Sequence, residues 1–239
     1  MSNLEDIAKN YDAMLEEWKD LEQAVRHKEF MNLISFCNED SKTVIEFGLG
    51  DGVATQMLCK HFEHVTGVDG AQTTLDLLKG KLEHNNITLE KSYVEDYKTD
   101  KKYDVIYMGH ILEHLKDPVI ALKNIKSLMH DKSIVYISVP NANSIHRLVA
   151  TKMGLLQTPE SLNKRDIELG HQIVFHPENF QLTVQEAGLK INHFGGVMIK
   201  PISNSQISKD WNREMIDGFI ALGDDLPELC GDIYIVAKL

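Results

Sequence analysis

Short apolar runs alternate along the chain with stretches in which apolar residues recur every three or four positions. The short runs cover residues 43–47, 65–68, 87–91, 105–108, 134–139, 191–194 and 233–237. The stretches between them include Leu75, Leu78 and Leu82, a spacing that places side chains on one face of a helix. Strands that alternate with helices favour right-handed crossovers onto a mostly parallel sheet. The pattern therefore predicts an α/β fold with seven strands.

A helical stripe also precedes the first predicted strand. Its apolar members are Ile7, Tyr11, Met14, Leu15, Trp18, Leu21 and Val25. We therefore expect an N-terminal helical cap over residues 1–40, followed by a main domain over residues 41–239. Residues 150–175 lack a strand pattern and contain glycine and proline, so we expect an insertion or lid there. Tyr11 and Trp18 of the cap are candidates to cover a ligand.

Glycine occupies every second position of the turn after the first predicted strand. Residues 44–52 read VIEFGLGDG, and a helical pattern follows. Gly48, Gly50 and Gly52 permit positive φ and a close approach of the backbone to a ligand, while the next helix offers unpaired N–H groups. Val53 stands where a dinucleotide-binding G-x-G-x-x-G motif has its third glycine, which weakens a pyrophosphate-binding interpretation. No Gly-Lys-Ser/Thr sequence follows either, so the turn does not match a Walker phosphate loop.

Two carboxylates belong to the strands beside this turn. Asp69 ends the second predicted strand, 17 residues after Gly52, where a carboxylate can accept both hydroxyls of a ribose. Glu46 adds a second acidic group at the end of the first strand. Two carboxylates repel a polyphosphate but suit a ligand that combines a ribose with a cationic amino-acid tail.

Four segments resemble motifs of class I S-adenosylmethionine-dependent methyltransferases. They are VIEFGLGDG at residues 44–52, VTGVDGA at 65–71, VEDY at 94–97 and DVIYMGHILEHLKDP at 104–118. The likeness covers residues 40–140 in order, with Glu46 where the family commonly has Asp. It implies a Rossmann-like sheet of order 3-2-1-4-5-7-6, with strand 7 antiparallel and helices on both faces.

The same resemblance implies S-adenosylmethionine as the cofactor. In that family the glycine turn lies under the methionine part of the cofactor, the acidic residue after the second strand holds the ribose, and the segment after the third strand meets the adenine. By this correspondence Asp69 binds the ribose, and Val94, Glu95 and Asp96 flank the adenine. The full set of cofactor candidates is Glu46, Gly48, Gly50, Gly52, Asp69, Gly70, Val94, Glu95, Asp96, Gly109 and His110.

Histidines beyond the strand ends are candidates for the chemical step. Methyl transfer from a sulfonium is an in-line displacement, which needs alignment but no metal or covalent intermediate, so we expect no metal. A hydroxyl acceptor must lose its proton, and histidine is the usual base near neutral pH. Residues 170–178, GHQIVFHPE, resemble a segment of small-molecule methyltransferases, and we favour His171 as the base. His110 and His176 are alternatives, although His176 also occupies a helix N-cap position.

Residues 110–114 contain a second histidine pattern, HILEH, which matches the H-x-x-E-H motif of inverted zinc proteases. That motif needs both histidines on one helix face and a third ligand downstream. Here it follows an apolar strand and precedes Pro118, so we expect His110 in the strand–helix turn instead. We therefore do not expect a zinc protease. Glu113 and His114 are expected near the cofactor or in supporting hydrogen bonds.

Polar residues at the same edge of the sheet are candidates to bind the methyl acceptor. Asn141 and Asn143 follow the fifth predicted strand, Arg147 comes shortly after, and Tyr11 completes the set. The C-terminal part resembles that of bacterial methyltransferases that act on sugars. This likeness favours a hydroxyl of a sugar, nucleotide sugar or phosphorylated surface-glycan precursor as the acceptor. It thus predicts a role in polysaccharide biosynthesis. The alternatives are N-methylation of an amino sugar, a non-catalytic cofactor-binding partner subunit and a nicotinamide-dependent oxidoreductase.

Composition and charge limit the classes of partner that we expect this protein to bind. The 239-residue chain carries 25 Lys and Arg against 36 Asp and Glu, a net charge of −11, which argues against nucleic acid as a partner. No apolar run approaches the roughly 20 residues that span a bilayer, and the start is polar and acidic, so we expect a cytoplasmic protein without membrane insertion. Three widely spaced cysteines indicate neither a disulfide framework nor a zinc knuckle. We expect a small-molecule substrate, with a homodimer as a possible assembly.

Overall fold

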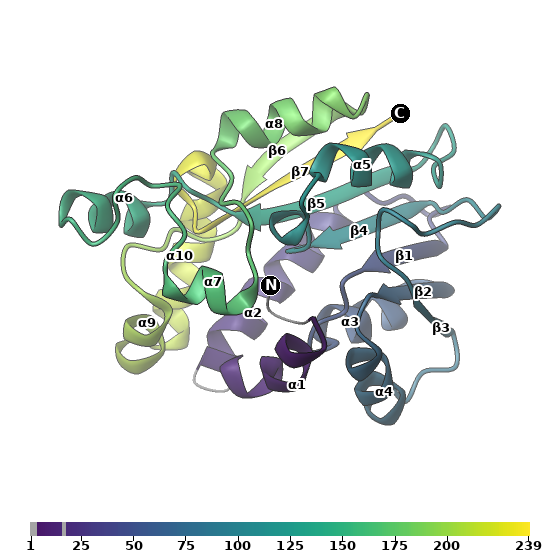
Figure 1. The fold of residues 1–239 in the computed structure, drawn as a ribbon, viewed down its shortest axis with the longest axis horizontal. Helices are drawn as coiled ribbons and strands as arrows, with labels where there is room; N and C mark the ends of the chain where they lie inside the picture. The colour runs from purple at the N-terminus through teal and green to yellow at the C-terminus, as the bar shows by residue number, and fades with distance from the viewer. Residues whose placement is uncertain (1–3, 16–17) are drawn as a thin grey trace.

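Seven strands form one sheet of order β3-β2-β1-β4-β5-β7-β6 (Figure 1). The computed structural model describes residues 4–15 and 18–239, without the side chains of residues 10–15. The strands are β1 (Thr43–Phe47), β2 (His64–Asp69), β3 (Ile87–Lys91), β4 (Val105–Gly109), β5 (Ile134–Pro140), β6 (Lys190–Gly196) and β7 (Asp232–Lys238). Pairing is parallel from β3 through β5, and β7 runs antiparallel to both β5 and β6. The predicted strands, their order and the antiparallel seventh strand are confirmed.

Helices cover both faces of the sheet, with α5 and α8 packed together on one face and α2 and α3 on the other (Figure 1). The helices are α1 (Leu4–Leu15), α2 (Lys19–Ile34), α3 (Val53–His61), α4 (Gln72–Lys81), α5 (Pro118–Lys126), α6 (Ile145–Lys152), α7 (Lys164–Leu169), α8 (Pro177–Glu186), α9 (Asn204–Asp210) and α10 (Arg213–Asp225), with the 3₁₀ turns η2 (Leu112–His114) and η3 (Pro227–Leu229). Within the described residues, no helix combines the length and the apolar character needed to cross a bilayer.

Side chains of each central strand alternate between two buried cores. Ile45 and Phe47 of β1 join the core beneath α5 and α8, whereas Val44 joins the core beneath α2 and α3. Burial on both faces is typical of a parallel sheet covered by helices. The helices thus occupy the faces, and the loops at the carboxyl edge of the strands are left to bind ligands.

The N-terminal apolar stripe is divided between α1 and α2 and does not form one helix. Trp18 stands at the N-cap of α2 with φ −123° and ψ 17°, outside the helical region. Helix α1 packs against α4, and α2 packs against α3. Apolar periodicity indicates which face of a helix is buried, but it does not indicate where one helix ends and the next begins. The sequence pattern therefore does not predict the break between α1 and α2.

The segment expected as a lid, residues 150–175, is largely irregular and contains α7. Asn163 caps α7 by accepting the Asp166 N–H, and the Asp166 carboxylate accepts the Asn163 N–H in return. Arg147 of α6 donates to Asp166 at 3.1 Å and to the carbonyl of Pro159 at 2.7 Å. These bonds give the lid segment a defined shape.

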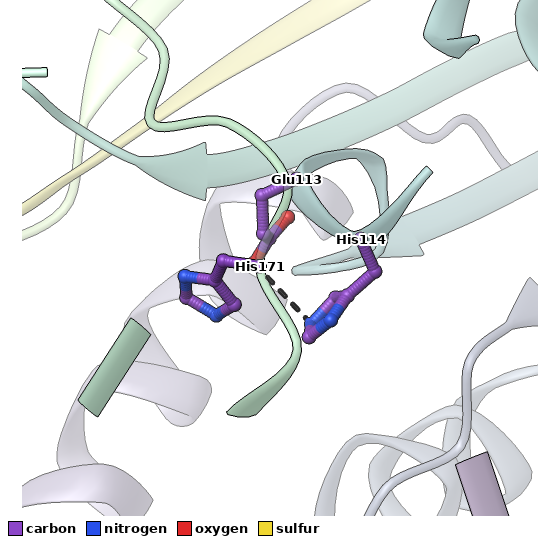
Figure 2. A group of neighbouring side chains, drawn as sticks. All are labelled: Glu113, His114 and His171. Atoms are coloured by element: carbon purple, nitrogen blue, oxygen red, sulfur yellow. Dashed lines mark ion pairs between the residues drawn. The ribbon is translucent and has the colours of Figure 1, made fainter. Parts of the chain in front are cut away.

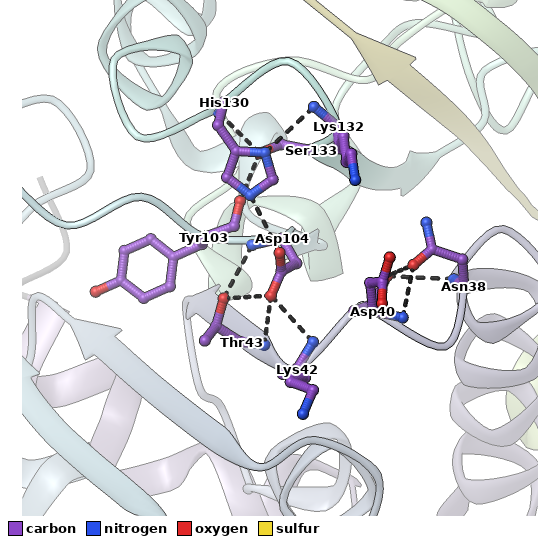
Figure 3. Close-up of polar contacts among 10 residues, drawn as sticks. Asn38, Asp40, Lys42, Thr43, Tyr103, Asp104, His130, Lys132 and Ser133 are labelled. Carbon is purple, nitrogen blue, oxygen red and sulfur yellow. Dashed lines mark hydrogen bonds and ion pairs between the residues drawn. The ribbon is translucent and has the colours of Figure 1, made fainter.

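A polar network joins β1 and β4 at the opposite, amino edge of the sheet (Figure 3). The Asp104 carboxylate accepts hydrogen bonds from the Thr43 N–H at 2.8 Å, the Thr43 hydroxyl at 2.7 Å and the Lys42 N–H at 3.0 Å. His130 Nε2 lies 3.1 Å from the same carboxylate. Partial burial opposes the charge of Asp104, but these hydrogen bonds outweigh it and lower the pKa of the carboxyl. The network holds the central strands in register away from the ligand-binding edge.

Candidate functional site

Two neighbouring cavities open at the carboxyl edge of the sheet. The smaller, of about 130 Å³, is lined by the glycine turn after β1, and we name it the turn cavity. The larger, of about 350 Å³, lies between α2, the lid segment and the loop after β6, and we name it the lid cavity. Arg26, His110, His114 and Leu169 line both cavities. The two cavities therefore adjoin at these four residues, which we name the junction.

The turn beside the cavity has glycine at two positions that favour this residue. Gly48 has φ +77°, and a Cβ there would lie 2.8 Å from Cδ1 of Ile111. Gly52 has φ +80° at the N-cap of α3, and a Cβ there would lie 2.3 Å from Cδ2 of Leu78. The left-handed backbone and the lack of space both favour glycine. The turn thus brings bare backbone to the cavity wall.

Asp69 holds the glycine turn from the end of β2. Its Oδ2 accepts the Leu49 N–H at 2.9 Å, and its Oδ1 accepts the Ala71 N–H at 2.8 Å. Burial raises the pKa of the Asp69 carboxyl in spite of these two bonds. Because each carboxylate oxygen can accept a second hydrogen bond, Asp69 can also bind two hydroxyls in the turn cavity.

Glu46 places a buried acid in the wall of the turn cavity. It is 1% exposed, and its Oε2 has no hydrogen-bond partner in the described part of the chain. Burial raises the pKa of its carboxyl to about 8, and the charges of Asp51 and Asp69 add to this effect. A buried acid with an unpaired oxygen fits a cationic ligand group. Glu46 and Asp69 together fit a ligand that carries a ribose and cationic groups.

Helix α1 covers the turn cavity. Its residues in the wall are Leu4, Ile7 and Ala8. Glu5 of the same helix accepts hydrogen bonds from the N–H groups of Gln72 at 2.8 Å and Thr73 at 3.0 Å, at the start of α4. These backbone bonds lower the pKa of Glu5 to about 2. The charged carboxylate therefore anchors α1 to the N-terminus of α4 across the neutral pH range.

The predicted cofactor residues divide into two groups. Those that line the turn cavity are Glu46, Gly48, Gly50, Asp69, Gly109 and His110, and those outside its lining are Gly52, Gly70, Val94, Glu95 and Asp96. Val94 is buried, and its carbonyl accepts a hydrogen bond from Asn124 Nδ2 at 2.7 Å. The side chain of Tyr11, predicted to bind the acceptor, lies outside the described residues.

His110 follows β4 with φ +53°, which is uncommon for a residue other than glycine. Its Nε2 lies 2.9 Å from Oε1 of the buried Glu29, and its Nδ1 lies 3.6 Å from Oε1 of Glu113. Burial opposes the charge of His110, but attraction to Glu29 outweighs it and raises the pKa of the imidazole well above its usual value. A charged imidazole has no lone pair to accept a proton, so this environment disfavours His110 as a base.

Glu113, His114 and His171 come together at the junction (Figure 2). Glu113 and His114 belong to η2, whereas His171 follows α7 in the lid segment. The rings of His114 and His171 meet edge to face with centroids 4.8 Å apart, and His114 Nε2 lies 3.9 Å from Glu113 Oε1. His171 Nδ1 lies 3.4 Å from Oδ1 of Asp166. The structure thus surrounds the predicted base with two acids and a second histidine.

The predicted acceptor residues are held by bonds within the protein. Asn141 lines the lid cavity, and its Nδ2 donates to the carbonyls of Glu228 and Cys230, both at 2.8 Å. Arg147 also lines this cavity, with its guanidinium bound to the lid segment as described above. Asn143 lies outside the lining. Asn141 and Arg147 therefore shape the cavity wall through their bonds to other segments.

His176, the remaining predicted base, occupies the N-cap of α8, and the helix begins at Pro177. Its side chain makes no capping hydrogen bond. It lies outside the lining of both cavities, so His176 takes no part in the junction.

Glu29 is a site residue that no sequence motif marks. It lies on the same face of α2 as Val25 and Leu33, four positions from each, and all three are buried. A charged residue within an apolar helix face is the signal that points to such a group. Its partner His110 is distant in the chain, so the contact itself cannot be read from the helix pattern.

Basic side chains line part of the lid cavity. Burial, together with Lys200 and Arg147, lowers the pKa of His146 to about 2. The guanidinium carbon of Arg165 lies 3.9 Å from the centroid of the Trp18 ring, in a cation–π contact that joins the lid segment to the start of α2. Arg147 is paired with Asp166, and Lys200 adds a further cationic group to the cavity wall.

Comparisons with known proteins give matches over most of the chain. A family model described as a methyltransferase domain matches residues 18–193. A ubiquinone biosynthesis O-methyltransferase of Coxiella burnetii is 27% identical over 173 residues, covering 71% of this chain and 73% of the relative. A protein of the same name from Aeromonas salmonicida is 23% identical over 219 residues, covering 84% and 88%. Among solved structures, an S-adenosylmethionine-dependent methyltransferase from Thermotoga maritima matches with a TM-score of 0.68 at 14% identity, covering 99% of each chain.

Proposed function

Because the chain belongs to the methyltransferase-domain family and is a class I S-adenosylmethionine-dependent methyltransferase, we propose that it methylates a hydroxyl of a small molecule bound in the lid cavity. The observation that carries this proposal is the junction, where His110 and His114 line both cavities. A methyl donor in the turn cavity and an acceptor in the lid cavity would meet there.

The residues of the turn cavity would hold the cofactor. Bound S-adenosylmethionine supplies a methyl group on a positively charged sulfur. Asp69 would accept the ribose hydroxyls, and the backbone of Gly48 and Gly50 would lie against the methionine part. Glu46 would face the cationic groups, where its unpaired oxygen supports such a contact. The turn at residues 94–96 would meet the adenine end, as the family resemblance implies.

The lid side of the junction would orient and activate the acceptor. In the reaction the acceptor oxygen forms a bond to the methyl carbon while the carbon–sulfur bond breaks, and the sulfur keeps the electron pair. The hydroxyl loses its proton. We place His171 beside the acceptor, on the side from which this proton leaves. Asp166, 3.4 Å from His171 Nδ1, would hold the ring in position. The lid segment would exclude water from the reacting atoms.

The wall of the lid cavity favours a polar acceptor. Its polar side chains include Glu22, Asn163, Ser203, Asn204, Ser205 and Asp232. Lys200 and Arg147 add positive potential near His146. A sugar, nucleotide sugar or phosphorylated glycan precursor offers several hydroxyls to such a wall and an anionic group to its basic side chains. We therefore propose an acceptor of this class.

A second candidate comes from the relatives in Coxiella burnetii and Aeromonas salmonicida, which are named ubiquinone biosynthesis O-methyltransferases. The name supports transfer to oxygen over transfer to the nitrogen of an amino sugar. It also makes a hydroxylated ubiquinone precursor the second acceptor to test. A homodimer stays an expectation, to be checked by light scattering.

The experiment supplies the purified protein with S-adenosylmethionine that carries an isotope-labelled methyl group. One panel of acceptors contains nucleotide sugars and sugar phosphates, a second contains hydroxylated ubiquinone precursors, and a third contains amino sugars. Heteronuclear NMR distinguishes an O-methyl from an N-methyl product. We expect the label on oxygen in the first panel. Label on oxygen in the second panel only would select the second candidate, and label on nitrogen alone would contradict the proposal.

A further inference from the structure

The side chains of Glu113, His114 and His171 bring three potential metal-ligand atoms within 4.8 Å of one another (Figure 2). One carboxylate and two imidazoles form a donor set typical of catalytic zinc sites, in which a further position stays open for water or substrate. Ligand atoms lie roughly 2.0–2.2 Å from zinc in such sites. Small rotations of the three side chains would therefore close the group around one cation.

Glu113 gives an independent indication of a missing ligand. It is 1% exposed, and neither carboxylate oxygen has a hydrogen-bond partner among the described residues. The charged imidazole of His110 lies 3.6 Å from Oε1 and offsets part of the charge of Glu113, but it is too far for a hydrogen bond, and its other nitrogen is bound to Glu29. A carboxylate buried without hydrogen bonds is costly unless a cation compensates it. A cation between Glu113 and the two neighbouring histidines would give these oxygens the direct contact that His110 does not provide.

Asp166 completes the arrangement expected around a metal-binding histidine. Metal-bound histidines usually direct their second ring nitrogen to a carboxylate or carbonyl, which fixes the ring. Asp166 Oδ1 lies 3.4 Å from His171 Nδ1, at ion-pair distance but without a hydrogen bond, which leaves Nε2 of the ring for a cation. Asp166 is itself fixed by Arg147 at 3.1 Å and by the Asn163 N–H at 2.8 Å. The ring of His171 is thus oriented by a rigid group of the lid segment.

We infer that Glu113, His114 and His171 bind one divalent cation of the Zn²⁺ type where η2 meets the lid segment. All three residues line the lid cavity, so an open coordination position would face a bound acceptor. The catalytic part of the inference rests on the proposed function. There the cation would hold the acceptor hydroxyl and lower its pKa, so that the proton passes to solvent water. His171 then serves as a ligand and not as the proton acceptor.

This inference departs from the expectation of no metal that the sequence suggests. The H-x-x-E-H pattern at residues 110–114 reads as a helical zinc motif, in which both of its histidines would be ligands. In the structure His110 turns away to Glu29. His171, which the chain brings back from the lid segment, takes its place beside Glu113 and His114. This group of three ligands can therefore be recognised in the folded structure but not in the sequence.

The test uses the full chain without a histidine tag, treated with EDTA and dialysed. Isothermal calorimetry with zinc sulfate measures affinity and stoichiometry, and the visible absorbance of added Co²⁺ reports the coordination geometry. We expect one Zn²⁺ per chain for the wild type. Glu113→Gln and His171→Ala should each weaken binding by at least about tenfold, and Asp166→Asn by about 10- to 100-fold. His64→Ala, at an exposed position at the start of β2, is the matched control and should bind like the wild type.

Circular dichroism and binding of S-adenosylhomocysteine verify that each variant is folded. A wild-type protein that binds no Zn²⁺, or folded Glu113→Gln and His171→Ala variants that bind it as tightly as the wild type, would overturn the inference. Methyl transfer unchanged by EDTA would overturn the catalytic role of the cation and leave the proposed function intact. Zn²⁺ binding lost in these variants, without methyl transfer to oxygen, would support the metal site and count against the proposed function.

Discussion

Nε2 of His110 lies 2.9 Å from Oε1 of Glu29, a contact that joins helix α2 to the turn after β4. The other oxygen of Glu29 lies 3.3 Å from Nη1 of Arg26. Burial opposes the charge of Glu29, but His110 and Arg26 outweigh it and lower the pKa of this carboxyl well below its usual value. Since Arg26 and His110 line both cavities, α2 positions the junction as well as covering it.

Replacement of Glu29 by glutamine should destabilise the protein. Glu29→Gln leaves the imidazolium of His110 buried without its main counter-charge, which costs about 3 kcal/mol when one partner of a buried ion pair is removed. Urea denaturation measures the change in the free energy of unfolding. The exposed Glu83→Gln should change it by less than about 0.5 kcal/mol. Equal stability of the two variants would show that the Glu29–His110 pair contributes nothing to the free energy of unfolding.

A pair of glycine substitutions tests the shape of the turn cavity. Gly48→Ala combines a φ of +77° with a Cβ only 2.8 Å from Ile111, so it should cost about 1–3 kcal/mol and abolish measurable cofactor binding. Gly80→Ala in α4 meets no atom within 4 Å and should be neutral or stabilising by up to about 1 kcal/mol. Thermal unfolding and calorimetry with S-adenosylhomocysteine measure both effects. Retention of wild-type affinity by Gly48→Ala would contradict the position assigned to the turn.

Glu46 should make cofactor binding depend on pH. Burial raises the pKa of this carboxyl to about 8 in the free protein, so it is mostly protonated near neutral pH. The cationic groups of S-adenosylmethionine favour the ionised form, so binding should release a proton and the affinity should rise with pH up to about 8. Calorimetry in phosphate and in Tris should therefore give different binding enthalpies. The difference between the two buffers should vanish in Glu46→Gln. Equal enthalpies in both buffers for the wild type would show that binding releases no proton.

Asp69 should contribute both to the ribose contact and to the turn itself. Asp69→Ala removes the acceptor for the N–H groups of Leu49 and Ala71 and for the ribose hydroxyls. Hydrogen bonds to a charged group contribute about 1.5–3 kcal/mol each, so the Kd for S-adenosylhomocysteine should rise by about 10- to 100-fold or more. Asp100→Ala, at an exposed position before β4, serves as the control. An unchanged Kd for Asp69→Ala would place the ribose elsewhere.

The sheet could be predicted from the sequence because its strands carry their own signal. A buried parallel strand is a short apolar run, and the runs at 43–47 and 105–108 match β1 and β4 to within one residue. The glycine turn and Asp69 carry local signals too, since left-handed backbone favours glycine and the last residue of a parallel strand lies at the edge of the sheet where ligands bind. The position of the turn cavity could therefore be predicted from these features of the sequence.

The junction could not be predicted in the same way because its contacts join distant segments. The pairing of Glu29 with His110 depends on how α2 crosses the sheet, which no periodicity records. Arg147 is predicted to bind the acceptor, and its guanidinium is bound to Asp166 of the short helix α7, a contact that no pattern in the lid segment indicates. The same segment brings His171 to Glu113, so the chemistry of the junction emerges only from the folded chain.

The central claim is that the cofactor occupies the turn cavity and presents its methyl group at the junction to an acceptor in the lid cavity. A crystal structure with bound S-adenosylhomocysteine tests this most directly. We predict ribose hydroxyls within hydrogen-bond distance of Asp69 and the sulfur at the junction, facing His114 and the lid cavity. S-adenosylhomocysteine bound in the lid cavity, or held in the turn cavity with its sulfur directed away from the junction, would contradict it.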